Sequence, residues 1–434
     1  MDFQVRPKLA LRRNLCNNNE MEDWEVIVIG GGAAGLMAAS RAAEQGRRTL
    51  LLEKKRRPGS KILISGGSRC NLTHALDVRG FVEAFGTQGP FLHSALAALG
   101  PEQLVDLFEA EGVVTKVESD GKIFPVSDRA EDILAALLAQ LRRSGCVLAV
   151  DEPVQSIAPC PAGLGVVTSK RTLRAESVIL TTGGQSYPGS GSTGDGYRWA
   201  AELGHAIVPL RPALVPITSH APWVLGLQGI TMPDVCVQVL EPSDDAARPI
   251  CLAQQRGSLL FAHFGVTGPA VLDVSRAVSG HAKPRGLVLR CDLLPDRKAD
   301  ALKAEFQEEC GGAGRRLALG IVARYVPLRL AETVAAQAGL DPGRRAAEVS
   351  RNERQQLVTW LKQFDIPISG TMGFNKAEIT AGGVALDEID SHRMESRLVP
   401  GLFFAGEILD VDGPIGGYNF QAAFSTGWLA GESA

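Results

Sequence analysis

The sequence predicts an α/β fold in which one nucleotide-binding domain is assembled from separate parts of the chain. Three observations predict it: a strand, glycine turn and helix at residues 24–46, a short apolar strand ending in glycines at residues 177–184, and a further strand, glycine turn and helix at residues 401–431. Unbroken apolar runs of this kind are typical of buried parallel strands. With 434 residues, the chain is long enough for two or three domains.

The first of these segments carries the most specific pattern. An apolar, β-branched run at residues 26–29 precedes Gly30, Gly32 and Gly35, which have the G-x-G-x-x-G spacing, and a second apolar strand ends in Glu53. In a Rossmann-type domain the three glycines allow the tight turn, the close approach of a pyrophosphate and the packing of helix on strand. The helix N-terminus then offers N–H donors to phosphates, and the acid accepts from a ribose. We therefore predict a dinucleotide site here.

The residues after Glu53 narrow the choice of nucleotide. A carboxylate at this position repels the 2′-phosphate of NADP, although the basic run at residues 54–57 weakens that argument. The glycine motif alone does not separate NAD from FAD. The long polar loop at residues 57–75 favours FAD, because a flavin ring has to be fixed by backbone N–H groups and small side chains. Cys70 in this loop either faces the flavin or is a bystander thiol, and we favour the second interpretation.

The stretch GPIGGYNFQAAFSTGW, at residues 413–428, fits the same cofactor. Gly416 and Gly417 let the backbone come within contact distance of a ring. The helix that follows presents its positive N-terminal end to the negative charge of a reduced flavin. Gly427 inside this helix costs about 1 kcal/mol relative to alanine, which predicts a close neighbour. The alternative interpretation is a glycine hinge before an ordinary packing helix.

Composition excludes several classes of protein. The net charge of −3 argues neither for a nucleic-acid partner nor for a membrane surface. Eight cysteines contain no C-x-x-C pair and seven histidines show no ligand spacing, so we predict no metal site. No apolar run approaches the roughly 20 residues of a membrane span, and the first residues lack a signal-peptide core. We expect a cytoplasmic protein with free thiols.

Taken together, the motifs resemble the BaiN/YhiN-type, aminoacetone oxidase-like family of FAD-dependent oxidoreductases, relatives of the larger fumarate-reductase-like flavoproteins. The matching stretches are VIVIGGGAAGLMAA, KILISGGSRCNLT, GKIFPVSDRAEDIL, GGQSYPGSGSTGDGY, LLFAHFGVTGPAVLDVS, EITAGGV and LFFAGEILDVDGPIGGYNFQAAFSTG. They run from residue 24 almost to the end of the chain. One departure is Ser68, which stands where we expect a third glycine, so the local turn is predicted to differ there.

The resemblance implies a discontinuous Rossmann-type FAD-binding domain with an inserted β-barrel and a small helical subdomain. Strand-like runs between Gly204 and Asp292 and helical patterns between Asp296 and Phe364 agree with it. The predicted boundaries are a disordered extension at 1–22, the FAD-binding domain at 23–204 and 377–434, a β-barrel-like domain at 205–294 and 365–376, and a helical insert at 295–364.

The predicted cofactor-binding residues follow from the motifs and the resemblance. They are Gly30, Gly32, Ala33, Ala34, Gly35, Glu53, Lys54, Ser65, Gly66, Gly67, Arg69, Cys70, Asn71, Val154, Thr182, Gly183, Gly184, Gly406, Glu407, Gly416, Gly417, Tyr418, Asn419 and Phe420. For catalysis we consider His263 a candidate general acid, because a histidine pKa is easily placed near neutrality. A packed histidine beside Phe261 and Phe264 is the competing interpretation. Tyr187 is the second catalytic candidate.

The leading functional hypothesis is an FAD-dependent oxidoreductase that moves a hydride through flavin N5 and acts on a small molecule. It is either an NAD(P)H-fed reductase of an activated C=C bond or an oxidase of a small amine. The absence of a second G-x-G-x-x-G after a strand favours the oxidase slightly, because NAD(P)H would have to bind without a Rossmann domain of its own. The alternatives are an FAD-dependent nucleic-acid-modifying enzyme and a non-catalytic flavin-binding protein. We expect no nucleic acid as partner, since only residues 54–57 form a basic cluster; the sequence leaves the oligomeric state open.

Overall fold

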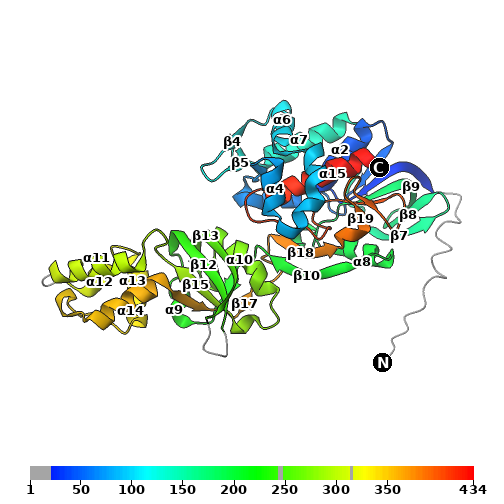
Figure 1. Ribbon diagram of the computed structural model, residues 1–434. Coiled ribbons are helices and arrows are strands. Elements are labelled where there is room, and N and C mark those ends of the chain that lie inside the picture. The colour runs from blue at the N-terminus through cyan, green and yellow to red at the C-terminus, as the bar shows by residue number, and fades with distance from the viewer. Residues whose placement is uncertain (1–20, 243–247, 313–315) are drawn as a thin grey trace, which may run out of the picture. The chain divides into compact units, whose positions relative to one another are not determined.

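The computed structural model describes residues 21–242, 248–312 and 316–434. Residues 1–20, most of the predicted disordered extension, lie outside the described part. The chain divides into two compact units: residues 1–210 together with 379–434, and residues 211–378 (Figure 1). The first unit is therefore built from two separate parts of the chain, and the second is a continuous insertion.

A mixed sheet with the order β19-β20-β21-β9-β1-β2-β6 forms the centre of the first unit. Its strands β21, β9, β1, β2 and β6 pair in parallel, in agreement with the predicted α/β class. Strands β7 and β8 extend the sheet from β9 as an antiparallel meander. The bounds are β1 (Glu22–Ile29), β2 (Thr49–Leu52), β6 (Val147–Ala149), β7 (Val154–Cys160), β8 (Gly163–Thr168), β9 (Thr172–Leu180), β19 (Ile389–Asp390), β20 (Glu395–Ser396) and β21 (Leu402–Phe404).

Helices α2 (Ala33–Glu44) and α15 (Tyr418–Ser433) pack directly against each other in this unit (Figure 1). A Cβ atom on Gly427 would lie 2.4 Å from the carbonyl oxygen of Ala34. Because a backbone oxygen cannot move aside as a flexible side chain does, only glycine fits at this contact. The close neighbour predicted for Gly427 is therefore confirmed, and it is the first turn of α2.

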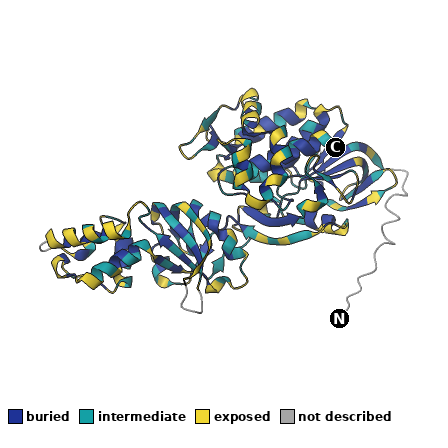
Figure 2. Cartoon of the chain, in the orientation of Figure 1, coloured by how far each residue is buried: buried dark blue, intermediate teal, exposed yellow. Residues whose placement is uncertain are grey.

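Further helices and a small sheet complete the first unit around a core in which the central strands are almost wholly buried (Figure 2). The helices are α3 (Ser60–Ile64), α4 (Val78–Ala84), α5 (His93–Ala98), α6 (Pro101–Ala110), α7 (Ala130–Arg143) and α8 (Asp195–Glu202). The small sheet has the order β3-β5-β4, with β3 (Thr73–His74), β4 (Thr115–Val117) and β5 (Lys122–Pro125). The chain leaves the first unit within β10 (Ile207–Ala213) and begins its return at β18 (Ile379–Val384).

The second unit contains an antiparallel sheet with the order β16-β15-β12-β13-β14-β11-β17. Its bounds are β11 (Ile217–Thr218), β12 (Thr231–Glu241), β13 (Ile250–Ala262), β14 (Gly265–Thr267), β15 (Val288–Asp292), β16 (Phe364–Pro367) and β17 (Gly370–Thr371). Helix α9 (Pro222–Leu225) is a single turn, and α10 (Pro269–Ser279) packs on β13 and β12. The strand pairings give an antiparallel sheet whose order ends at β16 and β17, and closure into the expected barrel is not seen in them.

Among the described residues, four helices lie between β15 and β16 in the chain. They are α11 (Ala299–Gly312), α12 (Ala318–Val322), α13 (Leu328–Gln337) and α14 (Arg351–Lys362). Their buried residues share one hydrophobic core with the sheet, and exposed residues cover their other sides (Figure 2). In the turn between α13 and α14, Gly343 N donates to Asp341 Oδ1 at 2.7 Å. No helix within the described ranges is long and apolar enough to cross a bilayer.

Candidate cofactor site

Four neighbouring parallel strands, β21, β9, β1 and β2, end at the same edge of the sheet in the first unit. Backbone hydrogen bonds continue beyond their last residues: Thr181 N donates to Ile29 O and Ala405 N donates to Leu180 O, both at 3.0 Å. Nucleotides bind at the carboxyl edge of such sheets. The predicted cofactor residues that follow these four strands therefore lie at the edge where a dinucleotide is expected.

The glycine turn after β1 has the geometry that the sequence motif predicts. Gly30 has a φ of 109°, which L side chains rarely adopt. A Cβ on Gly35 would lie 1.8 Å from the carbonyl oxygen of Gly30, so this glycine allows helix and strand to meet. A Cβ on Gly32 would meet no atom within 4 Å. The turn is thus packed against protein atoms at Gly30 and Gly35 and unobstructed at Gly32, the position at which a pyrophosphate approaches the backbone in this motif. Ala33 and Ala34 are the first two residues of α2.

The carboxylate of Glu53 is fixed beside this turn by backbone donors. Its Oε2 accepts from Gly31 N and its Oε1 accepts from Lys55 N, both at 2.8 Å. The carbonyl oxygen of Glu53 accepts from Glu152 N at 3.1 Å. Since two carboxylate oxygens offer about four acceptor sites, lone pairs remain for the hydroxyl groups of a ribose.

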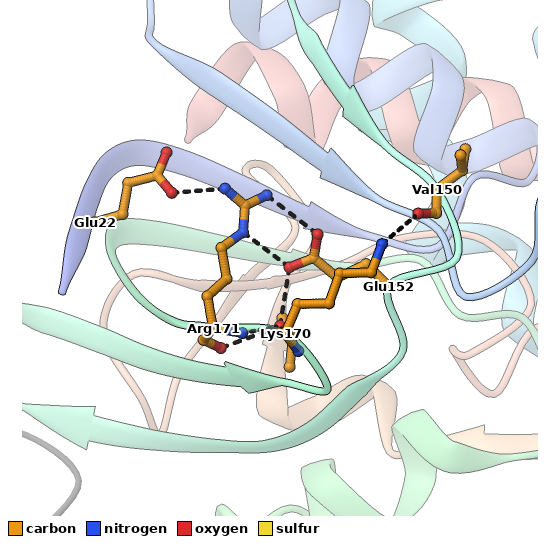
Figure 3. Close-up of polar contacts among 6 residues, drawn as sticks. Glu22, Val150, Glu152, Lys170 and Arg171 are labelled. Carbon is orange, nitrogen blue, oxygen red and sulfur yellow. Dashed lines mark hydrogen bonds and ion pairs between the residues drawn. The ribbon is translucent and has the colours of Figure 1, made fainter. Parts of the chain in front are cut away.

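An ion-pair network holds the segment that adjoins Glu53 (Figure 3). Glu152 Oε1 accepts from Arg171 Nε and from Thr168 Oγ1, both at 2.9 Å, and Arg171 also donates to Glu22 Oε2 at 2.6 Å. Burial opposes ionisation of Glu152, but the hydrogen bonds of Arg171 and Thr168 outweigh it, so the pKa of this carboxyl is lowered. The network ties the first residue of β1 to the turn before β9 and to the segment before β7, whose first residue is the predicted Val154.

The loop between α3 and β3 contains an unusual run of left-handed residues. Gly66 and Gly67 have φ values of 54° and 68°, and Ser68 follows with 68°. Ser68, which stands where a third glycine was expected, therefore keeps the positive φ of its two neighbours. Glycine adopts this conformation readily, whereas it is unfavourable for L residues. Ser65 begins this turn, and its hydroxyl donates to Ile62 O at 2.8 Å.

Three predicted residues at the end of this loop have separate environments. Arg69 Nη1 donates to Glu118 at 2.6 Å, and its guanidinium lies over Phe124. Cys70 is fully buried, and burial raises the pKa of its thiol to about 12, as expected for a bystander. The amide of Asn71, oriented to satisfy its neighbours, accepts from Gly417 N at 3.0 Å and so ties this loop to the terminal glycine turn.

The glycines after β9 surround an unsatisfied hydroxyl group. Thr182 Oγ1 is buried and has no hydrogen-bond partner within the described ranges. Gly183 has a φ of 70°, and a Cβ on Gly184 would lie 2.3 Å from Thr380 Oγ1. An orphaned buried hydroxyl at the end of a strand calls for a partner that the described residues do not supply, and a cofactor at the edge of the sheet would be one.

Glu407 links the end of β21 to two residues that sequence reasoning missed. Its Oε2 forms an ion pair with Lys61, and its Oε1 accepts from Thr380 N at 2.8 Å. The only sequence signal for Lys61 is its position in the KILISGG stretch. Just before Glu407, Gly406 has a φ of 77°, and a Cβ there would lie 2.8 Å from Ala34 Cβ. These contacts bring the ends of β21, β18 and α3 together.

The terminal glycine turn leads into α15 as predicted. Gly416 and Gly417 have φ values of 130° and 91°, and a Cβ on Gly417 would lie 2.5 Å from Thr73 O. Gly417 is the N-cap of α15 and provides no side-chain cap. The N-terminus of this helix has partial positive charge, which suits an anionic or carbonyl group of a ligand.

The first residues of α15 are held by neighbours on both sides. The ring of Tyr418 stacks on His74, whose Nδ1 lies 3.2 Å from Gly416 O; His74 is another residue that the sequence did not single out. Asn419 Nδ2 donates to Gly413 O at 3.0 Å, while Phe420 stacks on a phenylalanine one turn later. The side chains of Tyr418 and Asn419 thus hold the turn, since its glycines have no side chains that could do so.

The basic run after Glu53 and the two catalytic candidates make the following contacts. Lys54 forms an ion pair with Asp195 at 2.7 Å, and Lys55 donates to Gly189 O, so both lysines hold the loop before α8. Tyr187 begins this loop with a φ of 51°. His263 belongs to the second unit, where it is exposed at the turn between β13 and β14 with its ring against that of Phe264.

Comparison with known proteins places these features in a family context. Residues 24–433 match the family described as HI0933-like protein Rossmann domain. The chain is 34% identical to the ribosomal RNA dihydrouridine synthase of Escherichia coli K12, over 86% of this chain and 89% of that protein. It is 30% identical to the 3-dehydro-bile acid delta(4,6)-reductase of Clostridium scindens, over 87% and 90%. A structure of 3-ketosteroid-delta4-(5alpha)-dehydrogenase from Rhodococcus jostii RHA1 has a similar fold, with a TM-score of 0.50 and 16% identity over 99% of both chains.

Proposed function

This chain belongs to the HI0933-like family of FAD-dependent oxidoreductases, and we propose that it reduces the C5=C6 double bond of a uracil base in ribosomal RNA. The observation that carries this proposal is the 34% identity to a ribosomal RNA dihydrouridine synthase across nearly the whole of both chains. A fold-level likeness alone would not support a substrate, since one fold hosts many reactions.

The chemistry of the two named relatives supports the reductase over the oxidase. A uracil C5=C6 bond and the delta(4,6) double bonds of a 3-dehydro-bile acid are all conjugated to a carbonyl group, so each accepts a hydride at an electrophilic carbon of the conjugated system (β or δ to the carbonyl group), and a proton completes the reduction. The amine oxidase considered from the sequence has no counterpart among these relatives. The reductant we propose is NAD(P)H, which balances the reaction as uridine, NAD(P)H and a proton giving dihydrouridine and NAD(P)⁺.

The residues at the carboxyl edge of the sheet fit FAD. The open backbone at Gly32, the orphaned hydroxyl of Thr182 and the uncapped N-terminus of α15 are three features that a bound dinucleotide would satisfy. We propose that the turn of Gly30–Gly35 holds the pyrophosphate, that Glu53 holds the adenosine ribose, and that the start of α15 faces the flavin ring. FAD would supply the hydride. The protein would orient the uracil, keep water away and deliver the proton, for which His263 and Tyr187 remain our candidates.

A nucleic-acid substrate replaces the small molecule that the sequence led us to expect. That expectation rested on the single basic cluster at residues 54–57 and on a net charge that did not favour nucleic acid. The net charge of the whole chain hides an asymmetry between the units. Residues 211–378 contain 20 basic and 17 acidic residues, whereas the remainder contains 25 basic and 31 acidic residues. The inserted unit is therefore net positive while the unit with the cofactor edge is net negative, and a polyanionic substrate suits the former.

The test is direct. Purified protein should show flavin absorption, lose its yellow colour anaerobically on addition of NADPH or NADH, and then convert uridine to dihydrouridine in unmodified ribosomal RNA transcripts, as a mass increase of two hydrogens per site. Reduction of a 4-en-3-one steroid without any reduction of RNA would instead favour the bile-acid type of activity. A protein that takes up no FAD would contradict both.

A further inference from the structure

We propose that two copies of this chain associate through β6, the edge strand of the central sheet, in an antiparallel pairing about a two-fold axis. The proposal concerns the quaternary structure and does not depend on the proposed reaction. A two-fold interface uses the same surface on both copies, so that surface has to be complementary to itself. The strand β6 and its flanks meet this condition.

The strand β6 stands at one end of the strand order in the sheet. Among the described residues, the one strand that pairs with it is β2, in parallel, through Leu50, Leu51 and Leu52. An edge strand presents unpaired N–H and C=O groups to which a further strand can bind. The main chain of β6 therefore offers a pairing site on its outer side.

Apolar side chains of β6 are exposed on both faces of the sheet. Val147 is 48% exposed and Leu148 is 36% exposed. Successive residues of a strand point to opposite faces, so neither face of β6 is fully covered. A second sheet edge placed beside β6 would shield both side chains from water, whereas a ligand on one face would shield only one of them.

Other edges in the same unit have protective features that β6 lacks. The opposite end of the central sheet, β19, has only two residues, and one of them is Asp390. The edge strand β4 is flanked and ended by exposed valines, Val114 and Val117, but it contains Lys116. Short length and charged residues keep edges from pairing. The sequence of β6 is Val-Leu-Ala, without a charge or a proline.

The flanks of β6 carry opposite charges. Helix α7 ends in Arg142 and Arg143 shortly before the strand, and Asp151 follows shortly after it. Arg143 forms an ion pair with Glu111, whereas Arg142 forms none with an acid of the described residues. In an antiparallel pairing, the start of each strand lies beside the end of the other. The free arginine of each copy would therefore adjoin Asp151 of the other copy, and the two-fold axis makes this contact twice.

The same strand supports the segment that carries Glu53. The backbone N–H of Glu53 donates to Ala149 O at 2.8 Å, and Asp151 N donates to Lys55 O at 3.1 Å. A partner paired along β6 would restrain this backbone from the outer side. The interface would thus steady the carboxylate that is proposed to hold the adenosine ribose.

The first experiment measures the mass of the full-length protein by light scattering and sedimentation velocity over a wide range of protein concentrations. The edge variant is Val147→Lys with Leu148→Lys. The matched control is Val114→Lys with Val117→Lys, which changes two exposed valines at the edge strand β4. We expect wild type and the control to form dimers with the same dissociation constant. The edge variant should dimerise about tenfold or more weakly, because lysines on an edge oppose pairing and repel those of the other copy.

A charge exchange tests the antiparallel arrangement. Asp151→Lys should weaken dimerisation about three- to tenfold, because it places a lysine beside Arg142 of the other copy. Adding Arg142→Glu to that variant should restore dimerisation, since each copy then offers a glutamate to the lysine of the other. Asp151 has a φ of 51°, which strains a lysine, but the single and double variants share this strain. The melting temperature of each variant shows whether the fold is intact.

Each contrary result overturns the proposal. A wild type that stays monomeric at every concentration would do so, as would an edge variant that dimerises like wild type. Equal weakening of the edge variant and the control would mean that β6 is not the specific interface. A double variant no stronger than Asp151→Lys alone would exclude the antiparallel arrangement. If wild type is monomeric and a form without residues 1–20 dimerises, the N-terminal segment of the same chain covers the edge in place of a second copy.

Discussion

The imidazole Nδ1 of His205 lies 3.0 Å from Oε2 of Glu388 in the core of the first unit. On the other side of the ring, Nε2 lies 2.9 Å from Ser396 Oγ, an oxygen that also accepts from Leu398 N and Val399 N. The carboxylate accepts, so Nδ1 carries the proton and Nε2 accepts from the serine hydroxyl. These two contacts fix His205 as a neutral imidazole. Because the ring is buried, we interpret the Glu388–His205–Ser396 contacts as structural and not as a catalytic triad.

The stability of the first unit should fall as the pH drops below about 6.5. Burial lowers the pKa of His205 in spite of the attraction of Glu388. Between this lowered pKa of the folded state and the ordinary histidine pKa of about 6.5, the unfolded chain binds more protons than the folded one, so protonation favours unfolding. Urea unfolding of wild type and His205→Gln at a series of pH values checks this. An unchanged pH dependence in the variant would contradict it.

Arg171→Met should destabilise the protein by about 2 kcal/mol, because it leaves the buried carboxylate of Glu152 without its cation. This expected loss is smaller than the loss for a fully buried ion pair, because the Arg171 side chain is 34% exposed and water screens its charge. The double variant Glu152→Gln with Arg171→Met should recover much of the loss. Chemical unfolding of the three proteins measures the coupling, and additive losses would count against the paired network.

Gly427→Ala should destabilise the first unit by about 1–3 kcal/mol, because the new Cβ would lie 2.4 Å from Ala34 O. Gly320→Ala is the matched control. Gly320 also lies inside a helix, and its Cβ would meet nothing within 4 Å, so this change should be neutral or stabilising by up to about 1 kcal/mol. Similar melting temperatures for both variants would show that α15 does not need the close contact.

Gly32→Asp should separate folding from cofactor binding. Gly32 has the extended geometry of an N-cap, a Cβ meets no atom there, and aspartate is a favourable N-cap residue, so the apoprotein should stay folded. The added charge and bulk should abolish FAD binding if the pyrophosphate lies at this turn. Gly32→Ser controls for bulk without charge. Flavin retained by Gly32→Asp, measured by absorption at the flavin band, would place the cofactor elsewhere.

Cys70 should resist alkylation in the folded protein at pH 8 or so, because the pKa of its buried thiol is about 12 and the thiolate is the nucleophile. The exposed Cys251 should react first. Peptide mass spectrometry after a short iodoacetamide treatment, with Cys251→Ser as control, measures both. Early modification of Cys70 would mean that its loop opens readily.

The sequence was sufficient for features that depend on local backbone geometry. The glycines of the first turn and of the terminal turn could be predicted because L residues rarely adopt their φ values and a side chain would not fit against a neighbouring carbonyl oxygen. The buried strands around them followed from unbroken apolar runs.

The residues that sequence reasoning missed act through partners far along the chain. Lys61 meets Glu407 across 346 positions, and His74 meets Gly416 across 342. Neither contact leaves a periodic or spacing signal, because the pairing exists only once strands from both ends of the chain share a sheet. Closure of the inserted sheet also depends on residues far apart in the sequence. Alternation of apolar and polar residues predicts antiparallel strands, but not whether the first and last strands pair to close a barrel.

The contact of Gly427 with Ala34 also sets an order of events during synthesis. The N-terminal part of the first unit cannot complete its core until β21 and α15 have been made, and both follow the whole insertion in the chain. The insertion at 211–378 is continuous and has its own hydrophobic core, so it can fold before the N-terminal part of the first unit has completed its own core. Newly made chains therefore pass through a stage with an unfinished parallel sheet, and C-terminal truncations should yield aggregates rather than a smaller folded protein.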